Sequence, residues 1–330
     1  MSTKSKVDRR DFLKVGAAAA GLAGFPAIVT AQSAKLKVGM MLPYTGTYAP
    51  LGIAIENGFR LALQEAGGNF AGREIEFIKV DDESEPPKAT DNINKLVTRD
   101  KVDMVLGTVH SGVAAGMVRV TRESGTLHII PNAGFAPGAG ALCAPNIFRS
   151  SFSNWQSGYG MGAVMAKRPN VNKVVTLAWR YAAGEESVKG FKDAFLKTAG
   201  KSIVKELWIS FPNIEFQALL TEIASIKPDA VYSFFAGAGA AKYIKDYAAS
   251  GLMKTCPLMG AGFLTDGILD SLGGAGEGIE TALHYGDGIE TPKNKAFRLA
   301  YAKTFKLQPD GYAVAGYDSG AVSYTHLTLP

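Results

Sequence analysis

The chain has few cysteines and histidines and lacks the short motifs on which many enzymes depend. Of its 330 residues, two are cysteine and four are histidine, and none of them form a pattern with metal-ligand spacing. No phosphate-binding G-x-x-x-x-G-K-[ST], no zinc-binding H-E-x-x-H and no G-x-S-x-G nucleophile turn occurs. We therefore expect no metal and no cofactor. Cys143 and Cys256 lie far apart in the sequence, and we expect them to be unpaired.

Gly237-Ala238-Gly239 weakly resembles a dinucleotide-binding loop, because it follows an apolar run and opens a helical pattern. The third glycine is missing, and no acidic residue follows at the required distance. Small residues that let a loop approach a ligand or a neighbouring lobe are the better interpretation.

The positive net charge does not predict a nucleic-acid partner. The whole chain carries a formal charge of +5, but its first 31 residues contain five basic and two acidic residues, which leaves +2 for the remainder. No run of Lys or Arg interleaved with aromatic residues appears. We expect no binding to nucleic acid.

Residues 1–31 are typical of an export signal rather than of folded structure. The pair Arg9-Arg10 comes first, an uncharged Ala- and Gly-rich stretch follows, and Val29-Thr30-Ala31 offers small residues for a signal peptidase. This order predicts a signal peptide of the twin-arginine type and a periplasmic location, with the mature chain starting near Gln32. A basic, disordered N-terminus is the alternative, but it does not explain the three parts occurring together.

The last nine residues, 322–330, are similar to the read-through translation of a sequencing adapter. They interrupt an amphipathic helix expected from Tyr312 onward. We interpret the native reading frame as ending after about Ala321, with a genuine short tail as the alternative, and we assign His326 no role.

Apolar runs alternate with amphipathic stretches through the rest of the chain, as in parallel α/β sheets. A Gly-, Ala- and Pro-rich break at residues 132–145 separates two blocks of this pattern. The predicted strands of the first block are residues 36–42, 75–81, 102–107 and 127–130, and its helices are 52–66, 87–99 and 112–123. In the second block we predict strands at 174–178, 203–208, 230–235 and 257–260, and helices at 158–166, 185–199, 216–226, 240–249 and 292–305.

The pattern therefore predicts an α/β fold with two doubly wound parallel-sheet lobes. Ligands bind such sheets beyond the carboxyl ends of the strands, so the strand-to-helix loops are candidate walls of a cleft.

His110 and Ser111 lie in one of these loops and admit two interpretations. A Ser/His pair can indicate a hydrolase, but neighbouring loop residues rarely place the Ser oxygen on the adjacent imidazole, and no orienting acid is evident. The alternative is that the loop leads into a helix whose first N–H groups are free to bind a carboxylate. We favour the second interpretation and expect no enzymatic activity.

Several segments, in their order and spacing, resemble the solute-binding proteins of ABC importers. The chain is similar to the two-lobed, Venus-flytrap type that binds leucine, isoleucine and valine. The segments that carry the resemblance are residues 35–48, 107–112, 131–134, 148–151, 181–184 and 227–231. It implies that residues 35–153 and 285–321 form lobe one, that residues 154–284 form lobe two, and that a multi-strand hinge joins them.

The resemblance also implies the residues of the site. Loop hydroxyls and backbone N–H groups of lobe one would hold a ligand carboxylate, and a tyrosine of lobe two would close over it. With the aromatic residues expected in the cleft loops, the candidate ligand-binding residues are Tyr48, His110, Ser111, Gly112, Asn132, Ala133, Gly134, Tyr181, Phe235 and Phe263. The candidate hinge residues are Ser153, Asn154, Trp155 and His284. Of Phe234 and Phe235, at most one should meet the ligand, because adjacent strand residues point to opposite faces.

One departure from the family bears on the ligand. Amino-acid binders of this type carry an acid for the ligand ammonium on the loop that here reads Ala261-Gly262-Phe263-Leu264, without an acid. Glu185 and Glu186 could replace it only by turning inward, and we expect both to face solvent. A buried, unpaired ammonium costs several kcal/mol. The chain is thus closest to the subgroup that imports aromatic acids.

The sequence therefore predicts a monomeric periplasmic receptor that captures a small carboxylate, an aromatic acid, by hinge closure and delivers it to an ABC permease in the membrane. A branched-chain amino-acid receptor is the nearest alternative. A non-transport sensor of the same fold and a secreted hydrolase are the others.

Overall fold

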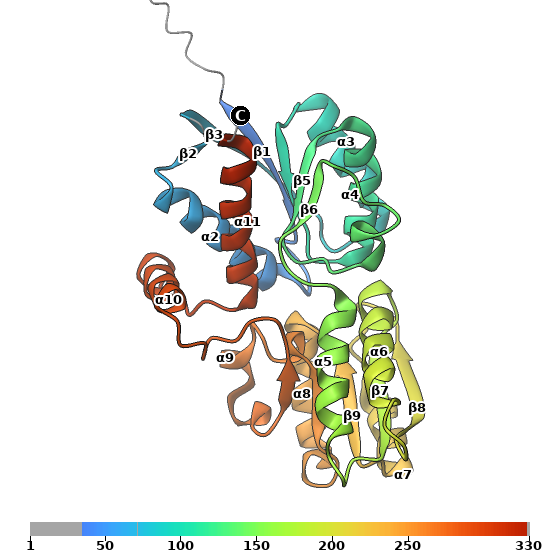
Figure 1. The fold of residues 1–330 in the computed structure, drawn as a ribbon. Helices are drawn as coiled ribbons and strands as arrows, with labels where there is room; N and C mark the ends of the chain where they lie inside the picture. Colours follow the sequence, from blue (N-terminus) through green and yellow to red (C-terminus); the bar gives the residue numbers. More distant parts are fainter. Residues whose placement is uncertain (1–34, 71, 329–330) are drawn as a thin grey trace, which may run out of the picture. The chain divides into compact units, whose positions relative to one another are not determined.

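The computed structural model describes residues 35–70 and 72–328, the last three by their backbone alone, so the predicted signal peptide lies outside the described residues. Two separate β-sheets organise this part of the chain (Figure 1). No helix among these residues is both long enough and apolar enough to cross a lipid bilayer.

The first sheet has the strand order β2-β3-β1-β4-β5-β6 and is parallel except for β2, which runs antiparallel to β3. Its strands are β1 (Leu36–Leu42), β2 (Asn69–Phe70), β3 (Arg73–Asp81), β4 (Met104–Leu106), β5 (Leu127–Ile130) and β6 (Ile147–Arg149). The helices that accompany it are α2 (Ala49–Glu65), α3 (Pro86–Asn94), α4 (Ser111–Ser124) and α11 (Gly311–Thr328). A π-helix, Lys95–Arg99, continues α3, and a 3-10 helix, Ala136–Ala139, precedes β6.

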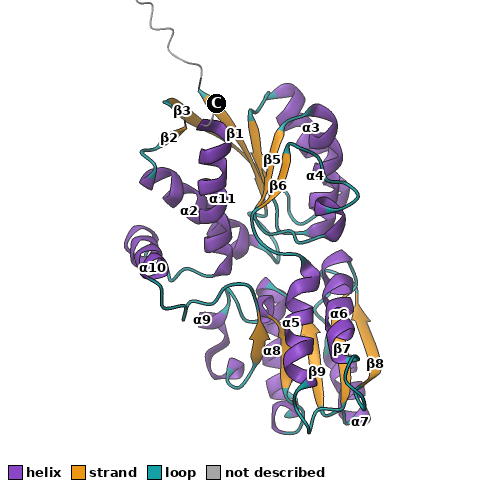
Figure 2. Ribbon diagram, in the orientation of Figure 1, coloured by secondary structure: helices purple, strands orange, loops and turns teal. Residues whose placement is uncertain are grey.

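Helices cover both faces of this sheet (Figure 2). In β1, Met40 belongs to the hydrophobic cluster that contains Ile55 and Phe59 of α2, whereas Met41 belongs to the one that contains Ile93 of α3. This alternation follows from the two-residue period of a strand. Because both faces are covered, β1 is a nearly continuous apolar run rather than an alternating one.

The second sheet is wholly parallel, with the order β11-β10-β9-β7-β8. Its strands are β7 (Lys173–Trp179), β8 (Ser202–Ile209), β9 (Ala230–Phe234), β10 (Leu258–Ala261) and β11 (Glu280–Ala282). The helices of this region are α5 (Asn154–Ala166), α6 (Ala182–Phe195), α7 (Gln217–Ile226), α8 (Gly237–Ala249) and α9 (Leu269–Leu272). Three 3-10 helices complete it: Leu252–Lys254, Gly262–Leu264 and Gly273–Gly276.

We call the regions built on the two sheets lobe one and lobe two. The chain passes from the first sheet to the second between β6 and α5, where the sequence predicts the boundary at residue 153. After β11 it returns to lobe one, because both α10 (Pro292–Phe305) and α11 pack against α2. The expected break in the last helix is absent: α11 continues through Thr328, and Ser323 is buried within it. The proposed adapter origin of residues 322–330 stays a prediction.

Close helix pairs hold each lobe together and depend on glycine. A Cβ atom added to Gly158 of α5 would lie 2.0 Å from the carbonyl oxygen of Ser187 on α6. A Cβ atom added to Gly190 of α6 would lie 2.1 Å from the carbonyl oxygen of Trp155 on α5. In lobe one, Gly58 of α2 and Gly316 of α11 face the partner backbone in the same way. These contacts leave no room for a methyl group.

We predict that Gly158→Ala lowers the free energy of unfolding by about 1–3 kcal/mol, because the added methyl group forces α5 and α6 apart. Urea unfolding measures this change. Gly274→Ala is the matched control, since no atom lies within 4 Å of its added Cβ. Equal stability of the two variants would contradict the close approach of α5 and α6.

Candidate functional site

A small cavity lies where strand-to-helix connections of both sheets meet. Its volume is about 20 Å³. Eleven residues line it: six aromatic (Tyr48, Phe152, Tyr181, Phe234, Phe263, Tyr312), three aliphatic (Val109, Ala183, Ala236) and two amides (Asn132, Asn154). None of these side chains carries a formal charge at neutral pH. The cavity is therefore aromatic, uncharged and built from both lobes.

Six of the lining residues lie at the start of a helix. Tyr48, Tyr181 and Ala236 are the N-cap residues of α2, α6 and α8. The other three, Asn154, Ala183 and Tyr312, belong to the first turns of α5, α6 and α11. The first N–H groups of a helix lack intrahelical acceptors and carry the positive end of its dipole. This arrangement favours an anion without any lysine or arginine.

A group of buried rings joins the lobes beside this cavity. The hydroxyl groups of Tyr48 and Tyr181 lie 2.8 Å apart and share a hydrogen bond. The ring of His110 stacks on Tyr181 at a centroid distance of 4.4 Å. Burial raises the pKa of both tyrosines above their ordinary value, so their hydroxyl groups stay protonated and can donate.

His110 is neutral and serves the first turn of α4. Burial lowers the pKa of its imidazole to about 4, and its Nδ1 accepts a hydrogen bond from the backbone N of Gly112 at 3.0 Å. The N–H of Gly112, a predicted ligand donor, is therefore engaged by His110. Among the described residues, no hydrogen bond links His110 to the Ser111 hydroxyl, which instead accepts one from Asn154 Nδ2 at 3.2 Å.

Asn154 and Glu186 also connect the lobes. Asn154 Nδ2 also donates to Glu186 Oε2 at 2.8 Å, and Glu186 Oε1 accepts from the backbone N of Ala136 at 2.9 Å. Glu186 was expected to face solvent. It is instead half-buried with both carboxylate oxygens engaged, whereas Glu185 is exposed.

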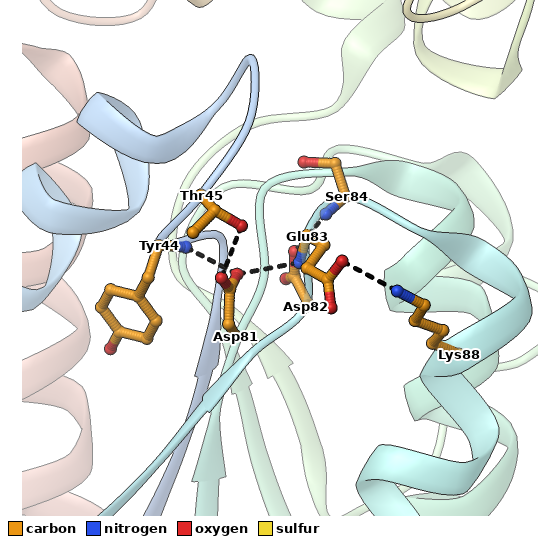
Figure 3. A network of polar contacts seen from close by, with 7 residues as sticks. All are labelled: Tyr44, Thr45, Asp81, Asp82, Glu83, Ser84 and Lys88. Atoms are coloured by element: carbon orange, nitrogen blue, oxygen red, sulfur yellow. Dashed lines mark hydrogen bonds and ion pairs between the residues drawn. The ribbon is translucent and has the colours of Figure 1, made fainter.

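Two acids at the end of β3 fix the lobe-one loops. Asp81 accepts hydrogen bonds from the backbone N of Tyr44 at 2.9 Å and from the Thr45 hydroxyl at 2.6 Å (Figure 3). The next residue, Asp82, is buried and accepts from the hydroxyl of Thr108. Because these partners follow β1 and β4, the network sets the position of the loops that carry Tyr48 and His110.

The structure brings some predicted residues to the cavity and engages others elsewhere. Tyr48, Asn132, Tyr181 and Phe263 line it. The backbone N of Ala133 donates to Thr108 O at 3.0 Å, and Gly134 O accepts from the backbone N of Asn154 at 2.9 Å.

Phe235 lies in the core of lobe two, where its ring contacts those of Trp179, Phe216 and Tyr243. Phe234 takes the cavity position that the sequence analysis gave to Phe235. Only one of the two meets the cavity, as strand alternation requires.

The candidate hinge residues differ in their surroundings. Ser153 is the N-cap of α5, and Asn154 is buried and lines the cavity. Trp155 faces away, with its Nε1 donating to Asp193 at 2.7 Å. The ring of His284, just after β11, lies 5.1 Å from that of Phe152.

Sequence reasoning missed Val109, Phe152, Ala183, Ala236 and Tyr312 as lining residues, and it chose Phe235 instead of Phe234. Ala183 and Ala236 carry no chemical signal. Tyr312 did carry a signal: it is an aromatic residue directly after Asp310-Gly311, at the start of a helix. It is, however, distant in sequence from every other candidate.

Elsewhere, the described residues contain no group of three or more His, Cys, Asp or Glu side chains that could hold a metal ion. Both cysteines are free, Cys143 exposed and Cys256 buried. A wider groove of about 450 Å³ lies beside the C-terminal end of α2. There the helix dipole disfavours an anion.

Two carboxyl groups meet next to Tyr312. Asp266 follows the 3-10 helix after β10, and its Oδ2 accepts from the backbone N of Gly311 at 2.9 Å. Asp310 caps α11 through Ala313 N at 2.8 Å. Burial raises the pKa of both groups, and the charge of Asp310 adds to the effect on Asp266. The folded protein therefore holds protons here that the unfolded chain releases.

We predict that Asp266→Asn stabilises the protein at pH 8 by at least about 1.4 kcal/mol, the free-energy equivalent of one pKa unit. Because the folded-state pKa is raised, the wild type loses stability as the pH rises from about 4 through neutrality, and the amide removes that loss. Urea unfolding at pH 5 and pH 8 gives the comparison, with Asp270→Asn on exposed α9 as the control. A difference between wild type and Asp266→Asn that does not grow with pH would refute the prediction.

Comparison with known proteins places this geometry in a family. Residues 35–323 match the sequence profile of the periplasmic binding proteins, and residues 6–26 match that of twin-arginine translocation signals. A Leu/Ile/Val-binding protein homologue of Brucella melitensis is 24% identical over 266 residues, which are 79% of this chain and 67% of the relative.

Two solved structures are similar. A solute-binding protein of an ABC transporter from R. palustris, in complex with benzoate, is 50% identical with a TM-score of 0.86, over 89% of this chain and 81% of that one. Another from Rhodopseudomonas palustris BisB5, in complex with 3,4-dihydroxybenzoic acid, is 31% identical with a TM-score of 0.84, over 89% and 80%. These matches confirm the predicted fold and the predicted export signal. The chain belongs to the periplasmic binding protein family and is exported to the periplasm by the twin-arginine route.

Proposed function

We propose that the protein is a receptor that captures a small aromatic carboxylate between its lobes and delivers it to the permease of an ABC importer, without chemistry of its own. One observation carries the proposal: an uncharged cavity with six aromatic residues stands at the starts of helices from both lobes. Aromatic walls match a ring, and helix starts match a carboxylate.

The lining supports an aromatic acid over an amino acid. None of the eleven residues is acidic, so an ammonium group placed there would be buried without a counter-charge, at a cost of several kcal/mol. Both oxygens of Glu186 are engaged by Asn154 and Ala136. The relatives bound to benzoate and 3,4-dihydroxybenzoic acid support the same ligand class.

A carboxylate, by contrast, can be held here by neutral donors. Asn132 presents an amide on the cavity wall, and the hydrogen bond between Tyr48 and Tyr181 uses only one of their two O–H groups, so the other can donate. Hydrogen bonds to an ionised oxygen are about twice as strong as those between neutral groups. The site therefore discriminates by the sign of charge without containing a charge itself.

Binding requires movement of the two lobes. A benzene ring occupies a cavity of about 150 Å³ in other proteins, whereas this one has about 20 Å³. The Tyr48–Tyr181 hydrogen bond and the hydrogen bond from Ala238 N to Thr47 O both cross between the lobes. A ligand enters when these contacts open, and it stabilises the closed form by touching both lobes at once.

The hydrolase alternative finds no support in the site. His110 Nδ1 accepts from Gly112, its ring stacks on Tyr181, and Ser111 accepts from Asn154. The imidazole is thus committed to the backbone and to a tyrosine rather than to a nucleophile.

We expect benzoate, phenylacetate or cinnamate to raise the unfolding temperature, and leucine, isoleucine and valine to leave it unchanged. A ligand at one hundred times its dissociation constant adds about 2.7 kcal/mol of stability. Thermal shift on the exported protein, with each compound in parallel, provides the measurement. A shift with the branched-chain amino acids alone would assign the receptor to that class instead.

A further inference from the structure

Tyr312 has a feature that the proposed function does not yet use. It is the second residue of α11, it is 1% exposed, and it lines the cavity. Its hydroxyl oxygen is buried and has no hydrogen-bond partner among the described residues. Buried polar atoms without partners are rare in folded proteins, and each one needs an explanation.

Other buried hydroxyl groups share this lack of a partner, but they lie elsewhere. Those described by the structure are Tyr44, Ser84, Ser151 and Thr176. None of them lines the cavity. Among the residues that the structure describes, only Tyr312 combines an unpaired buried hydroxyl with a place on the cavity wall.

The surroundings of Tyr312 make it a hydrogen-bond donor. Burial raises the pKa of its phenol well above the ordinary value, and the nearby carboxyl groups of Asp266 and Asp310 raise it further. The hydroxyl group therefore keeps its proton. Asp266 and Asp310 accept from backbone N–H groups of α11 instead, those of Gly311 and Ala313.

Tyr312 also belongs with the two tyrosines that join the lobes. The charge it would carry on ionisation raises the pKa of Tyr48, and Tyr181 acts on Tyr312 in the same way. The hydrogen bond between Tyr48 and Tyr181 uses one O–H group of that pair. The hydroxyl group of Tyr312 takes no part in it and can donate to an acceptor that enters the cavity.

We propose that Tyr312 is a ligand-binding residue whose hydroxyl group donates a hydrogen bond to an oxygen atom of the bound aromatic acid. The inference rests on the proposed function and adds to it a third tyrosine, supplied by the last helix of lobe one. The acceptor is either a carboxylate oxygen or a hydroxyl oxygen on the ring. Both are oxygen acceptors, and they can be separated by the choice of ligand.

The test is Tyr312→Phe, which removes only the hydroxyl group, titrated calorimetrically with benzoate and with 4-hydroxybenzoate. We expect the dissociation constant to increase roughly 10-fold or more for at least one of these ligands. Without ligand, the variant should unfold at the same or a higher temperature, because an unpaired buried hydroxyl contributes nothing favourable.

Tyr247→Phe is the matched control. Tyr247 is another fully buried tyrosine, but its hydroxyl donates to the backbone oxygen of Cys256 at 2.9 Å, and the residue does not line the cavity. Its loss should lower the unfolding temperature and leave both dissociation constants unchanged. If Tyr312 had only a structural role, Tyr312→Phe would likewise lower the unfolding temperature and leave both dissociation constants unchanged.

The ligand pair decides which oxygen is bound. Equal weakening for both ligands assigns the contact to the carboxylate, and weakening for 4-hydroxybenzoate alone assigns it to the ring hydroxyl. Unchanged binding of both ligands by Tyr312→Phe overturns the inference while the proposed function stands. If the unsubstituted protein binds neither these nor other aromatic acids, the proposed function fails, and this inference fails with it.

Discussion

The convergence of helix N-termini on one uncharged cavity is the constraint on which the rest of this structure depends. Parallel strands place every following helix start at the same sheet edge, and here two such edges supply the walls of a single cavity. The helices provide positive potential without cations. Aromatic residues can therefore occupy the wall itself, where each buried ring face contributes roughly 2–3 kcal/mol of apolar burial. The helix starts thus favour a negative charge, and the aromatic residues of the wall favour a ring.

The same cavity acts as the joint between the lobes. Tyr48 and Tyr181 share a hydrogen bond between neutral hydroxyl groups, and the carboxylate of Glu186 accepts hydrogen bonds from Asn154 and Ala136. Both sets of contacts lie beside the space that a ligand needs. The loops that carry these residues are held by buried acids such as Asp82, which ties the loop after β3 to Thr108 after β4. Opening therefore exchanges a few polar contacts between the lobes, while the core of each lobe stays packed around its own sheet. That exchange is small enough for a bound ligand to reverse.

The long buried strands were predicted well, whereas the short strands β2 and β6 were not predicted and several helix starts were misplaced. The apolar runs at Leu36–Leu42 and Leu127–Ile130 gave strands with the predicted bounds, because burial on both faces leaves an unmistakable pattern. Helices α2, α6 and α8 begin three residues before their predicted positions. Their N-caps are Tyr48, Tyr181 and Ala236, which make no side-chain cap, so the usual Ser, Thr, Asp or Asn signal is absent. Tyr312 was not predicted as a lining residue for another reason. It is distant in sequence from the other candidates, and it reaches the cavity only because the end of the chain returns to lobe one.

Calorimetric titration with three molecules of nearly the same shape tests the central claim most directly. Benzoate, benzamide and benzylamine present an anion, a neutral group and a cation on the same ring. If helix starts select the charge and aromatic walls select the ring, benzoate binds most tightly, benzamide binds at least about 10-fold more weakly, and protonated benzylamine does not bind. Equal affinity for benzoate and benzamide, or tight binding of benzylamine, would contradict the account.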